Sequence, residues 1–297
     1  FLELLIEIFR LYSQCKKNHT LHDLQQYTLE EFLNKYSYSN NIKNFHIYPM
    51  IAAIWSCNKK EVSNMPLITF INFFNNHKLF NFKNRQQWKY VSNGSDNYIK
   101  SIIDKKIFKY NVSKEAKKII RNNNNVKIIF SDNEEFLTNK VVIATHADQA
   151  LNLLDSPTNS ENNVLSKFRY TKNYAYLHSD NNLMPKRKSV WSSWNFIAEE
   201  DNDNSFSITY WMNLLQNIKS KNNYFVSINP SKIPNKYYDK TIFEHPIYNL
   251  ETLEAQKQIH NIQGINNTWF CGSYCGYGFH EDGIQSAAYV SGLLNTE

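Results

Sequence analysis

The residues best suited to chemistry lie close together near the end of the chain, in the stretch WFCGSYCGYGFHEDGIQSAAYV (residues 269–290). It contains Cys271, Cys275 and His280. It also contains four of the protein's 7 glycines: Gly272, Gly276, Gly278 and Gly283. Two cysteines and a histidine could bind zinc, and a thiol beside a histidine could act as a nucleophile. A backbone that a ligand approaches closely is a third interpretation.

The glycine positions favour the third interpretation. Structural zinc sites pair their ligands, and no second pair follows Cys271 and Cys275. No third group is evident that would orient His280 toward a nucleophilic thiol. Gly272 comes directly after an apolar strand, where a missing Cβ lets the chain turn and a ligand approach. Gly283, at the start of the predicted final helix, would leave N–H groups and the helix dipole open to an anion. Plain turn glycines remain an alternative.

The elements around this stretch alternate between strand and helix. A short strand (268–272) precedes it, and the helix is predicted from Gly283 to about residue 294. Upstream, NVKIIF (125–130) and NKVVIAT (139–145) read as two strands joined by a hairpin turn. The continuous apolar run in the second strand is typical of a strand buried on both faces, and HADQALNLL continues it as a helix.

Two further regions have other patterns. The first 80 residues are mostly helical: an amphipathic start, a capping box from Thr28 to Glu31, and helices over 44–57 (with Pro49 in a first turn) and 66–80. Residues 167–243 read as four strands broken by polar loops such as 199–204, which predicts an antiparallel sheet. One domain interrupted by another is the natural interpretation, with α/β architecture and an α+β insertion.

Composition limits the functional classes. The chain is 42% hydrophobic and 15% aromatic, which indicates a folded protein. The net charge of +6 is spread out; the densest basic cluster, 186–188, is too short for a nucleic-acid arm and leaves phosphate or peripheral lipid contact open. Four scattered cysteines favour a reducing compartment, so we expect a cytoplasmic protein. No segment predicts a membrane span, and nothing predicts an oligomeric state.

Several segments, taken together and in order, match a known group of proteins. The tail TWFCGSYCGYGFHEDGIQSAAYVSGLL resembles the C-terminal signature of predicted NAD/FAD-binding proteins related to flavin-containing amine oxidases and phytoene-desaturase-like enzymes. The resemblance covers about residue 44 to the end. Other segments that carry it are YPMIAAIWS, RQQWKYVSNGSDNYI, VVIATHADQAL, FRYTKNYAYLHSDNNLMPKRKSVWSSWNF, TYWMN and FEHPIYNL.

The resemblance implies an FAD-binding Rossmann-like domain interrupted by a substrate domain. The segments expected from it are 1–90 (helical part of the substrate domain), 91–152 (middle part of the FAD domain), 153–262 (β-rich substrate domain) and 263–297 (C-terminal part of the FAD domain). The residues that it places at the cofactor are Gly272, Ser273, Gly283, Ile284, Gln285, Ala144, Thr145 and Val112. A helix N-terminus there would favour the negative charge of a reduced flavin.

The sequence departs from the pattern of this family in three places. The wider superfamily often has an acidic residue where this chain has Ser273, and a glycine pair where it has Asn93-Gly94. No glycine precedes Gly94, so the G-x-G-x-x-G unit that holds the FAD pyrophosphate is not in the sequence. We therefore expect an FAD domain incomplete at the N-terminus, in a chain that is the remainder of a longer protein.

The function implied is an FAD-dependent oxidoreductase that removes a hydride equivalent from an amine or from an apolar acyl or polyene chain. His280 and Glu281 are candidate general bases or, equally, groups that stabilise the helix N-terminus. Trp55, Tyr210 and Trp211 are candidates for an aromatic pocket or plain core. No metal and no nucleic-acid partner are expected. The alternative is a non-catalytic fragment, or half of a split protein whose partner supplies the nucleotide-binding unit.

Overall fold

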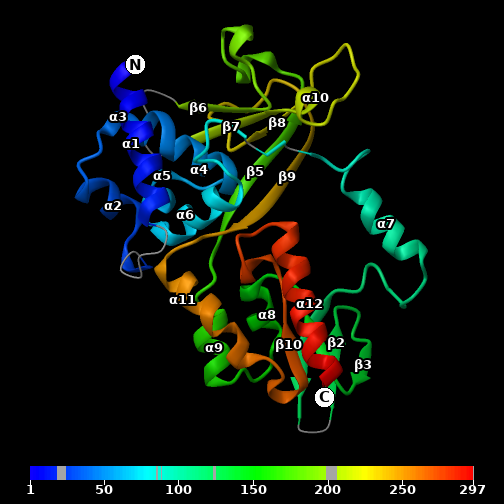
Figure 1. Ribbon diagram of the computed structural model, residues 1–297. Coiled ribbons are helices and arrows are strands. Elements are labelled where there is room, and N and C mark those ends of the chain that lie inside the picture. The colour runs from blue at the N-terminus through cyan, green and yellow to red at the C-terminus, as the bar shows by residue number, and fades with distance from the viewer. Residues whose placement is uncertain (19–24, 85, 88, 123–124, 199–205, 297) are drawn as a thin grey trace. The chain divides into compact units, whose positions relative to one another are not determined.

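The protein divides into two compact units in the computed structural model, which describes residues 1–18, 25–84, 86–87, 89–122, 125–198 and 206–296 (Figure 1). The first unit comprises Phe1–Phe108 and Thr171–His245; the second comprises Lys109–Tyr170 and Pro246–Glu297. Each unit is thus built from two separate stretches of chain. Among the expected segments, the loop 199–204 and residues 85 and 88 lie outside the described residues.

The boundaries of these units differ from those expected. The expected segments change at 90, 152 and 262, whereas the chain passes between units after residues 108, 170 and 245. The reason is that two helices expected in the substrate domain, α9 (Asn159–Leu165) and α11 (Leu250–Gln258), pack in the core of the second unit through Val164, Leu165 and Ala255. The assignment of one unit to the cofactor and the other to the substrate stays a prediction.

Helices make up the N-terminal part of the first unit. They are α1 (Leu2–Asn18), α2 (Leu29–Lys35), α3 (Asn40–Ile42), α4 (Tyr48–Trp55), α5 (Lys59–Ser63), α6 (Leu67–Asn76) and α7 (Asp96–Asp104), with a π-helical turn at Lys43–Ile47. The predicted capping box is confirmed, because Thr28 and Glu31 bond to each other's backbone N–H groups. Pro49 lies in the first turn of α4, also as predicted.

The other part of the first unit is a five-stranded sheet. Its strands are β5 (Tyr170–His178), β6 (Trp194–Ala198), β7 (Phe206–Trp211), β8 (Phe225–Ile228) and β9 (Tyr237–Pro246), in the order β6-β7-β8-β5-β9. The pairs β6–β7, β7–β8 and β5–β8 are antiparallel, which confirms the predicted sheet. β9 was not expected as a strand, and a short helix, α10 (Met212–Leu215), follows β7.

The second unit contains two small sheets. An antiparallel sheet holds β1 (Ala116–Arg121), β2 (Val126–Phe130) and β3 (Glu135–Thr138), in that order. A parallel pair holds β4 (Val141–Ile143) and β10 (Thr268–Phe270). The predicted hairpin was therefore wrong in its partner: β2 pairs with β3, and β4 pairs with the C-terminal strand instead.

The strand β4 is also less buried than its apolar run predicted. Ile143 is buried, but the Val142 side chain is 41% exposed. The alternation in burial arises because successive side chains of a strand point to opposite faces of the sheet. On the face of Val142, the paired residue Trp269 is buried against Val290, while Val142 itself is left partly exposed. Ile143 packs with Phe270, Ala147 and Ala150 in the main core of that unit.

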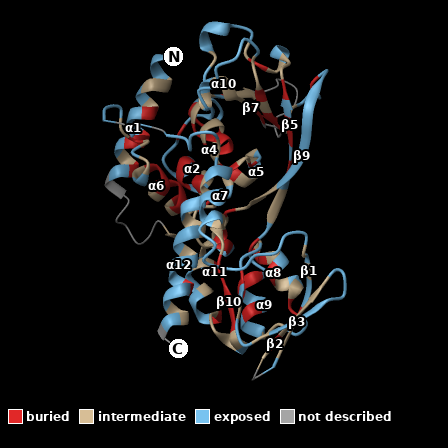
Figure 2. Cartoon of the chain, turned by 90° about the vertical axis from the view of Figure 1, so that its right-hand side faces the viewer, coloured by how far each residue is buried: buried red, intermediate tan, exposed pale blue. Residues whose placement is uncertain are grey.

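Helices cover that core: α8 (Ala147–Leu153), which follows β4, packs there with α9 and α11. α12 (His280–Thr296) follows β10 and presents mostly exposed residues along its outer side (Figure 2). α12 begins at His280, three residues earlier than predicted. Asp282 explains the earlier start, because its carboxylate accepts the Phe279 N–H at 2.9 Å and so satisfies a donor at the helix N-terminus. Val290 packs against Trp269 and Cys271 in a smaller cluster.

Candidate functional site

The carboxyl ends of β4 and β10 bring four of the predicted cofactor residues together. Phe270 lies opposite Ile143, and the Cys271 N–H donates to the Ile143 carbonyl at 3.2 Å. Ala144 and Thr145 follow one strand and Gly272 and Ser273 follow the other, so the two loops leave the sheet at the same edge. Ligands of open parallel sheets bind at this edge.

The turn after β10 needs its glycines for space. A Cβ on Gly272 would lie 2.6 Å from Cε1 of Tyr274 and 3.5 Å from the Thr145 carbonyl oxygen. A Cβ on Gly276 would meet the Asp282 carboxylate. Gly278 has φ +94°, a conformation that glycine adopts readily, and Tyr248 Oη lies against it. The atoms that exclude a Cβ at these glycines belong to the protein itself, so the approach of a ligand to this backbone stays a prediction.

Ser286 fastens this turn to the first turns of α12. Its hydroxyl oxygen accepts the Gly272 N–H at 3.0 Å, while the hydroxyl lies 2.8 Å from the Gly283 carbonyl. A Cβ on Gly283 would lie 3.7 Å from the Ser273 nitrogen, so helix and turn are close together. The sequence pattern showed Ser286 only as a small residue, and its bond to Gly272 depends on the fold.

The N–H groups expected to face the flavin are arranged differently from the prediction. Because α12 starts at His280, Gly283 lies inside the first turn and its N–H donates to the Phe279 carbonyl at 3.2 Å. It is therefore not an open donor, contrary to the expectation. Ile284 and Gln285 are exposed and lie one and two positions further into the helix than Gly283. The N-terminal residues of the helix that precede Gly283 carry the positive end of the dipole.

One buried polar group of this turn is without a partner among the described residues. The turn is otherwise closed on itself, since the Ser273 carbonyl accepts from the N–H groups of Gly276 and Gly278 at 3.1 Å each. The Tyr274 side chain is 2% exposed and its hydroxyl has no hydrogen-bond partner in the described chain. Burial raises the pKa of Tyr274 well above its usual value, so the hydroxyl keeps its proton. A buried donor without a partner is costly, so a bound polar ligand would be stabilised here.

A histidine and a tyrosine hold the loop after β4. The rings of His146 and Tyr170 stack with centroids 4.1 Å apart and planes inclined by 7°. The Tyr170 hydroxyl accepts the Ala147 N–H, the first of α8, at 3.0 Å. Tyr170 thus replaces the N-cap side chain that α8 lacks. The sequence could not show this contact, because 23 positions separate the two residues.

The cysteines do not support the metal or thiol interpretations. Cys271 is buried, and burial raises its pKa. Burial, followed by the charge of Cys271, raises the pKa of Cys275 to about 12, so its thiol stays protonated at neutral pH. Among the described residues, no three His, Cys, Asp or Glu side chains gather as a metal site. Both thiols act as packing groups in this structure.

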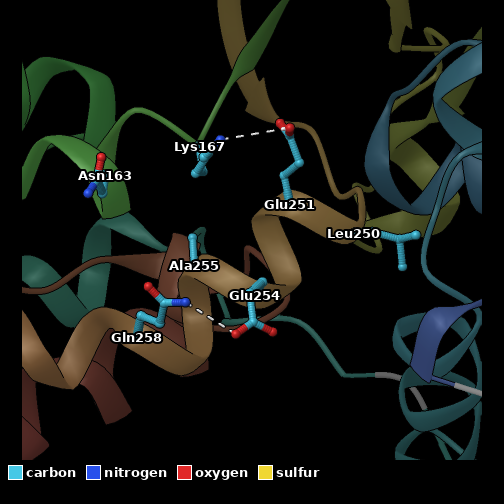
Figure 3. A pocket seen from close by; sticks show the side chains of 7 residues that line it. All are labelled: Asn163, Lys167, Leu250, Glu251, Glu254, Ala255 and Gln258. Atoms are coloured by element: carbon cyan, nitrogen blue, oxygen red, sulfur yellow. Dashed lines mark hydrogen bonds and ion pairs between the residues drawn. The ribbon is translucent and has the colours of Figure 1, made fainter. Parts of the chain in front are cut away.

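Two hollows lie in the second unit. One, of about 270 Å³, adjoins the turn and is lined in part by the predicted residue Gln285, with Cys275, Asp282 and Ser286. The other, of about 370 Å³, lies between α9 and α11 and contains none of the predicted site residues (Figure 3). Its charged side chains pair across it, with Lys167 3.8 Å from Glu251. The first hollow is therefore the one associated with the candidate site.

The remaining candidates in the second unit lie at its surface. His280 and Glu281 occupy the first turn of α12 and are exposed. The Glu281 carboxylate accepts from the Gln285 amide at 2.8 Å, one turn further along the helix. An acidic residue in a first turn also stabilises the helix dipole. Val112, predicted to bind adenine through its backbone, is 75% exposed and lies before β1.

The three aromatic candidates in the first unit do not line one pocket. Trp55 is 5% exposed and lies 4.6 Å from the Phe73 ring. Tyr210 donates to the Ala53 carbonyl of α4 at 3.2 Å. Trp211 is the next residue of β7 and therefore points to the opposite face, where its indole donates to Asn223 at 3.2 Å. The structure brings Trp55 and Tyr210 to the α4 side and separates Trp211 from both.

The whole chain resembles solved structures of amine oxidases. It covers 99% of its length and 76% of a putrescine oxidase bound to putrescine, with a TM-score of 0.69 and 10% identity. With cyclohexylamine oxidase from Brevibacterium oxydans IH-35A, the match covers 99% of this chain and 75% of the oxidase, with a TM-score of 0.62 and 11% identity. With a CLA-producing fatty acid isomerase from P. acnes, it covers 99% of this chain and 74% of the isomerase, with a TM-score of 0.64 and 11% identity. The chain therefore shares the fold of putrescine oxidase and cyclohexylamine oxidase, in agreement with the fold that the sequence resemblance implied.

Comparisons by sequence found no match. No protein-family model matches the chain, and no curated protein is significantly similar to it. Among the helices that the structure describes, none combines the length and apolar character that a bilayer crossing requires.

Proposed function

We propose that the protein is an FAD-binding oxidoreductase whose cofactor lies at the carboxyl edge of β4 and β10. One observation carries this proposal: the buried Tyr274 hydroxyl of the glycine turn has no partner in the described chain. The fold shared with putrescine and cyclohexylamine oxidases supports it. A dinucleotide has phosphate, ribityl and ring acceptors that such donors can bind.

The residues of the site have distinct roles in this proposal. Gly272 and Ser273 bind the ribityl and pyrophosphate region through the backbone, and Ala144 and Thr145 form the opposite loop. The N-terminus of α12, near Gly283, Ile284 and Gln285, favours negative charge on the bound group. Bound flavin would accept the hydride equivalent from substrate. The protein supplies orientation and excludes water.

The substrate proposed is an amine or an apolar acyl or polyene chain. The similar structures act on different compounds: putrescine, cyclohexylamine and, in the isomerase, a fatty acid. We propose His280 or Glu281, both exposed in the first turn of α12, as the group that takes a proton. Trp55 and Tyr210 are retained as candidates for an aromatic surface beside α4.

A flavin-binding measurement tests the proposal directly. The purified chain is titrated with FAD, and the quenching of flavin fluorescence and the visible absorption of the dialysed protein are recorded. We expect saturable binding, with competition from FMN, which carries the ribityl chain and ring that this edge would bind. ADP lacks both and should compete less, because the G-x-G-x-x-G unit that holds the pyrophosphate is not in the sequence. A chain that is folded by circular dichroism but leaves FAD fluorescence unchanged would contradict the proposal.

The open edge of β4 favours a second candidate: a chain that binds a partner strand and contributes only half of a nucleotide site. The Ile143 carbonyl accepts from Cys271, so the N–H and C=O of neighbouring Val142 face away from β10. The outer edge of β10 is closed instead by the Gln263 amide, which bonds to both backbone groups of Phe270 at 2.9 Å. An exposed edge of this kind accepts an added strand.

Hydrogen exchange separates the two candidates. In an isolated chain with an open edge, the Val142 amide exchanges quickly while the Ile143 amide is protected. Protection of Val142 that appears only when a second polypeptide is bound would favour the split-site candidate. Protection of Val142 that appears when FAD alone is added, together with fluorescence quenching, would favour the complete flavoprotein.

A further inference from the structure

Three loops of the first unit gather at one end of its antiparallel sheet. Segment 179–193 follows β5, segment 212–224 joins β7 to β8, and segment 229–238 leads from β8 into β9. His178, at the end of β5, pairs with Phe225, at the start of β8, so the first two segments leave the sheet at the same end (Figure 1). We refer to these three segments together as the loop surface.

Direct contacts hold the loop surface together. The Asn235 N–H donates to the Asp180 carboxylate at 3.2 Å, which joins the first and third segments. The hydroxyls of Ser179 and Tyr238 lie 2.9 Å apart and join the same two. The amide of Asn223 donates to Asn181 at 3.4 Å, which joins the second segment to the first. The loops therefore form one continuous surface.

The loop surface carries the whole charge surplus of the protein. Its basic residues are Lys186, Arg187, Lys188, Lys219, Lys221, Lys232 and Lys236. All seven are exposed, and none forms an ion pair with any described residue. Asp180 is the acidic residue of these segments, so their net charge is 7 − 1 = +6. The chain as a whole is also +6, so the rest of it sums to zero.

Each of the three loops also exposes an aliphatic side chain. Val190 is 57% exposed in the first, Leu214 is 53% exposed in the second, and Ile233 is 65% exposed in the third. Beside Val190, the Trp191 indole donates to the Pro185 carbonyl at 2.7 Å, and Lys188 lies 5.7 Å from the Trp191 ring. These contacts fix the loop that carries the basic cluster, so its side chains are presented without further ordering.

We propose that the loop surface docks the protein peripherally on an anionic lipid membrane. Clustered lysines and arginines are attracted to the negative surface of such a bilayer, and aliphatic side chains among them enter the boundary of the acyl region. A nucleic acid would use the same positive charge but has no place for three protruding aliphatic groups, which favours the membrane. The inference does not depend on whether flavin binds, because every residue in it belongs to the first unit.

Vesicle sedimentation tests this proposal. The protein is mixed with vesicles of phosphatidylcholine alone or of phosphatidylcholine with phosphatidylglycerol, at low and at physiological salt. We expect binding to the anionic vesicles that weakens with salt, and little binding to the neutral ones. Replacing Lys186, Arg187 and Lys188 by Gln should weaken binding about 100-fold, from roughly fivefold for each basic residue.

A matched control separates this surface from charge in general. The triple variant K117Q, K127Q and K257Q makes the same change of charge in the second unit and should leave binding within about twofold. The double variant L214S and I233S keeps the charge and should weaken vesicle binding about tenfold or more, since two apolar contacts are lost. The substituted residues are exposed, apart from the half-buried Lys127, and the melting curve and FAD titration of each variant should match the parent.

Three outcomes would overturn the inference. The first is equal binding to neutral and anionic vesicles, or none to either. The second is a loss in the control triple variant as large as in the variant at 186–188. The third is tighter binding to a single-stranded oligonucleotide than to vesicles, unaffected by L214S and I233S, which would assign the surface to a nucleic acid.

Discussion

The antiparallel sheet of the first unit and the parallel strand pair of the second unit differ in how their buried polar groups are paired. In the antiparallel sheet of the first unit, the buried side chains of His178, Ser227 and Thr209 bond to one another, at 2.8 and 2.7 Å. In the turn that follows the parallel pair of the second unit, the buried Tyr274 hydroxyl is left without a partner in the described chain. The first sheet pairs its buried polar side chains with one another, whereas the turn beside the second sheet leaves a buried donor unpaired.

This difference separates structural residues from ligand-binding residues without any reference to motif. A closed polar network stabilises a unique packing and gains nothing from a ligand. Open donors next to glycines that admit no Cβ lower the stability of the free protein and become favourable only when a ligand pairs with them. We therefore expect substitutions in the first sheet to change folding, and substitutions at the parallel edge to change binding.

The largest expected effect concerns a buried ion pair between β1 and α9 of the second unit. Arg121 and Glu161 form an ion pair whose side chains are 2% and 0% exposed, and Arg121 also donates to the Ser156 carbonyl at 2.9 Å. Replacing Arg121 by Met leaves the Glu161 charge buried without its partner. We expect a loss of about 3–5 kcal/mol in the free energy of unfolding, measured by urea denaturation. The variant K257A, at an exposed pair, should lose less than about 1 kcal/mol.

Substitutions at two glycines, Gly272 in the turn and Gly292 in α12, test whether the turn binds FAD. Gly272→Ala places a Cβ 2.6 Å from the Tyr274 ring, which is buried and cannot move freely. Such overpacking costs about 1–3 kcal/mol, and we expect FAD binding to be lost as well. Gly292→Ala is the matched control, since no atom lies within 4 Å of its Cβ and Ala favours the helix by up to about 1 kcal/mol. Fluorescence titration that gives the same FAD affinity for both variants would sink the assignment of the turn.

The network of His178, Ser227 and Thr209 should make the free energy of unfolding depend on pH. Burial lowers the pKa of His178, and the negative charge of Asp180 opposes this only in part. The unfolded chain, with a histidine pKa of about 6.5, then binds the proton more readily than the folded chain. The contribution of neutral His178 to the free energy of unfolding is therefore complete above a pH of about 6.5. It is lost as the pH falls from there toward the lowered pKa of His178 in the folded chain. His178→Gln should flatten the acid limb of the stability–pH curve; an unchanged limb would show that His178 is not involved.

The sequence predicted the parts of this molecule whose causes are local. The capping box at Thr28, the first-turn Pro49 and the strand-turn-helix at the C-terminus each depend on residues a few positions apart. The antiparallel sheet followed from its strand pattern, and the fold followed from the resemblance. Among the cofactor candidates, the structure gathers Gly272, Ser273, Ala144 and Thr145 at one edge.

What the sequence did not predict depends on long-range partners. The pairing of β4 with β10 joins residues more than a hundred positions apart, so the local turn after β2 suggested the wrong hairpin. α12 starts at His280 and not at Gly283 because the Asp282 carboxylate accepts the Phe279 N–H. The prediction placed the start at Gly283 because it rested on the glycine alone. Trp211 looked like a neighbour of Tyr210 in sequence, but strand geometry places it on the other face.

The smallest expected effect tests whether the glycine turn after β10 depends on its contact with α12. Ser286→Ala removes the acceptor of the Gly272 N–H and should cost about 0.5–1.5 kcal/mol of stability. Ser286→Thr keeps the hydroxyl and serves as the control. Because Gly272 is then free to move, we expect weaker FAD binding in the alanine variant and near-parental binding in the threonine variant. Equal affinities in fluorescence titration would mean that the turn keeps its shape without α12, and that its glycines alone define the binding edge.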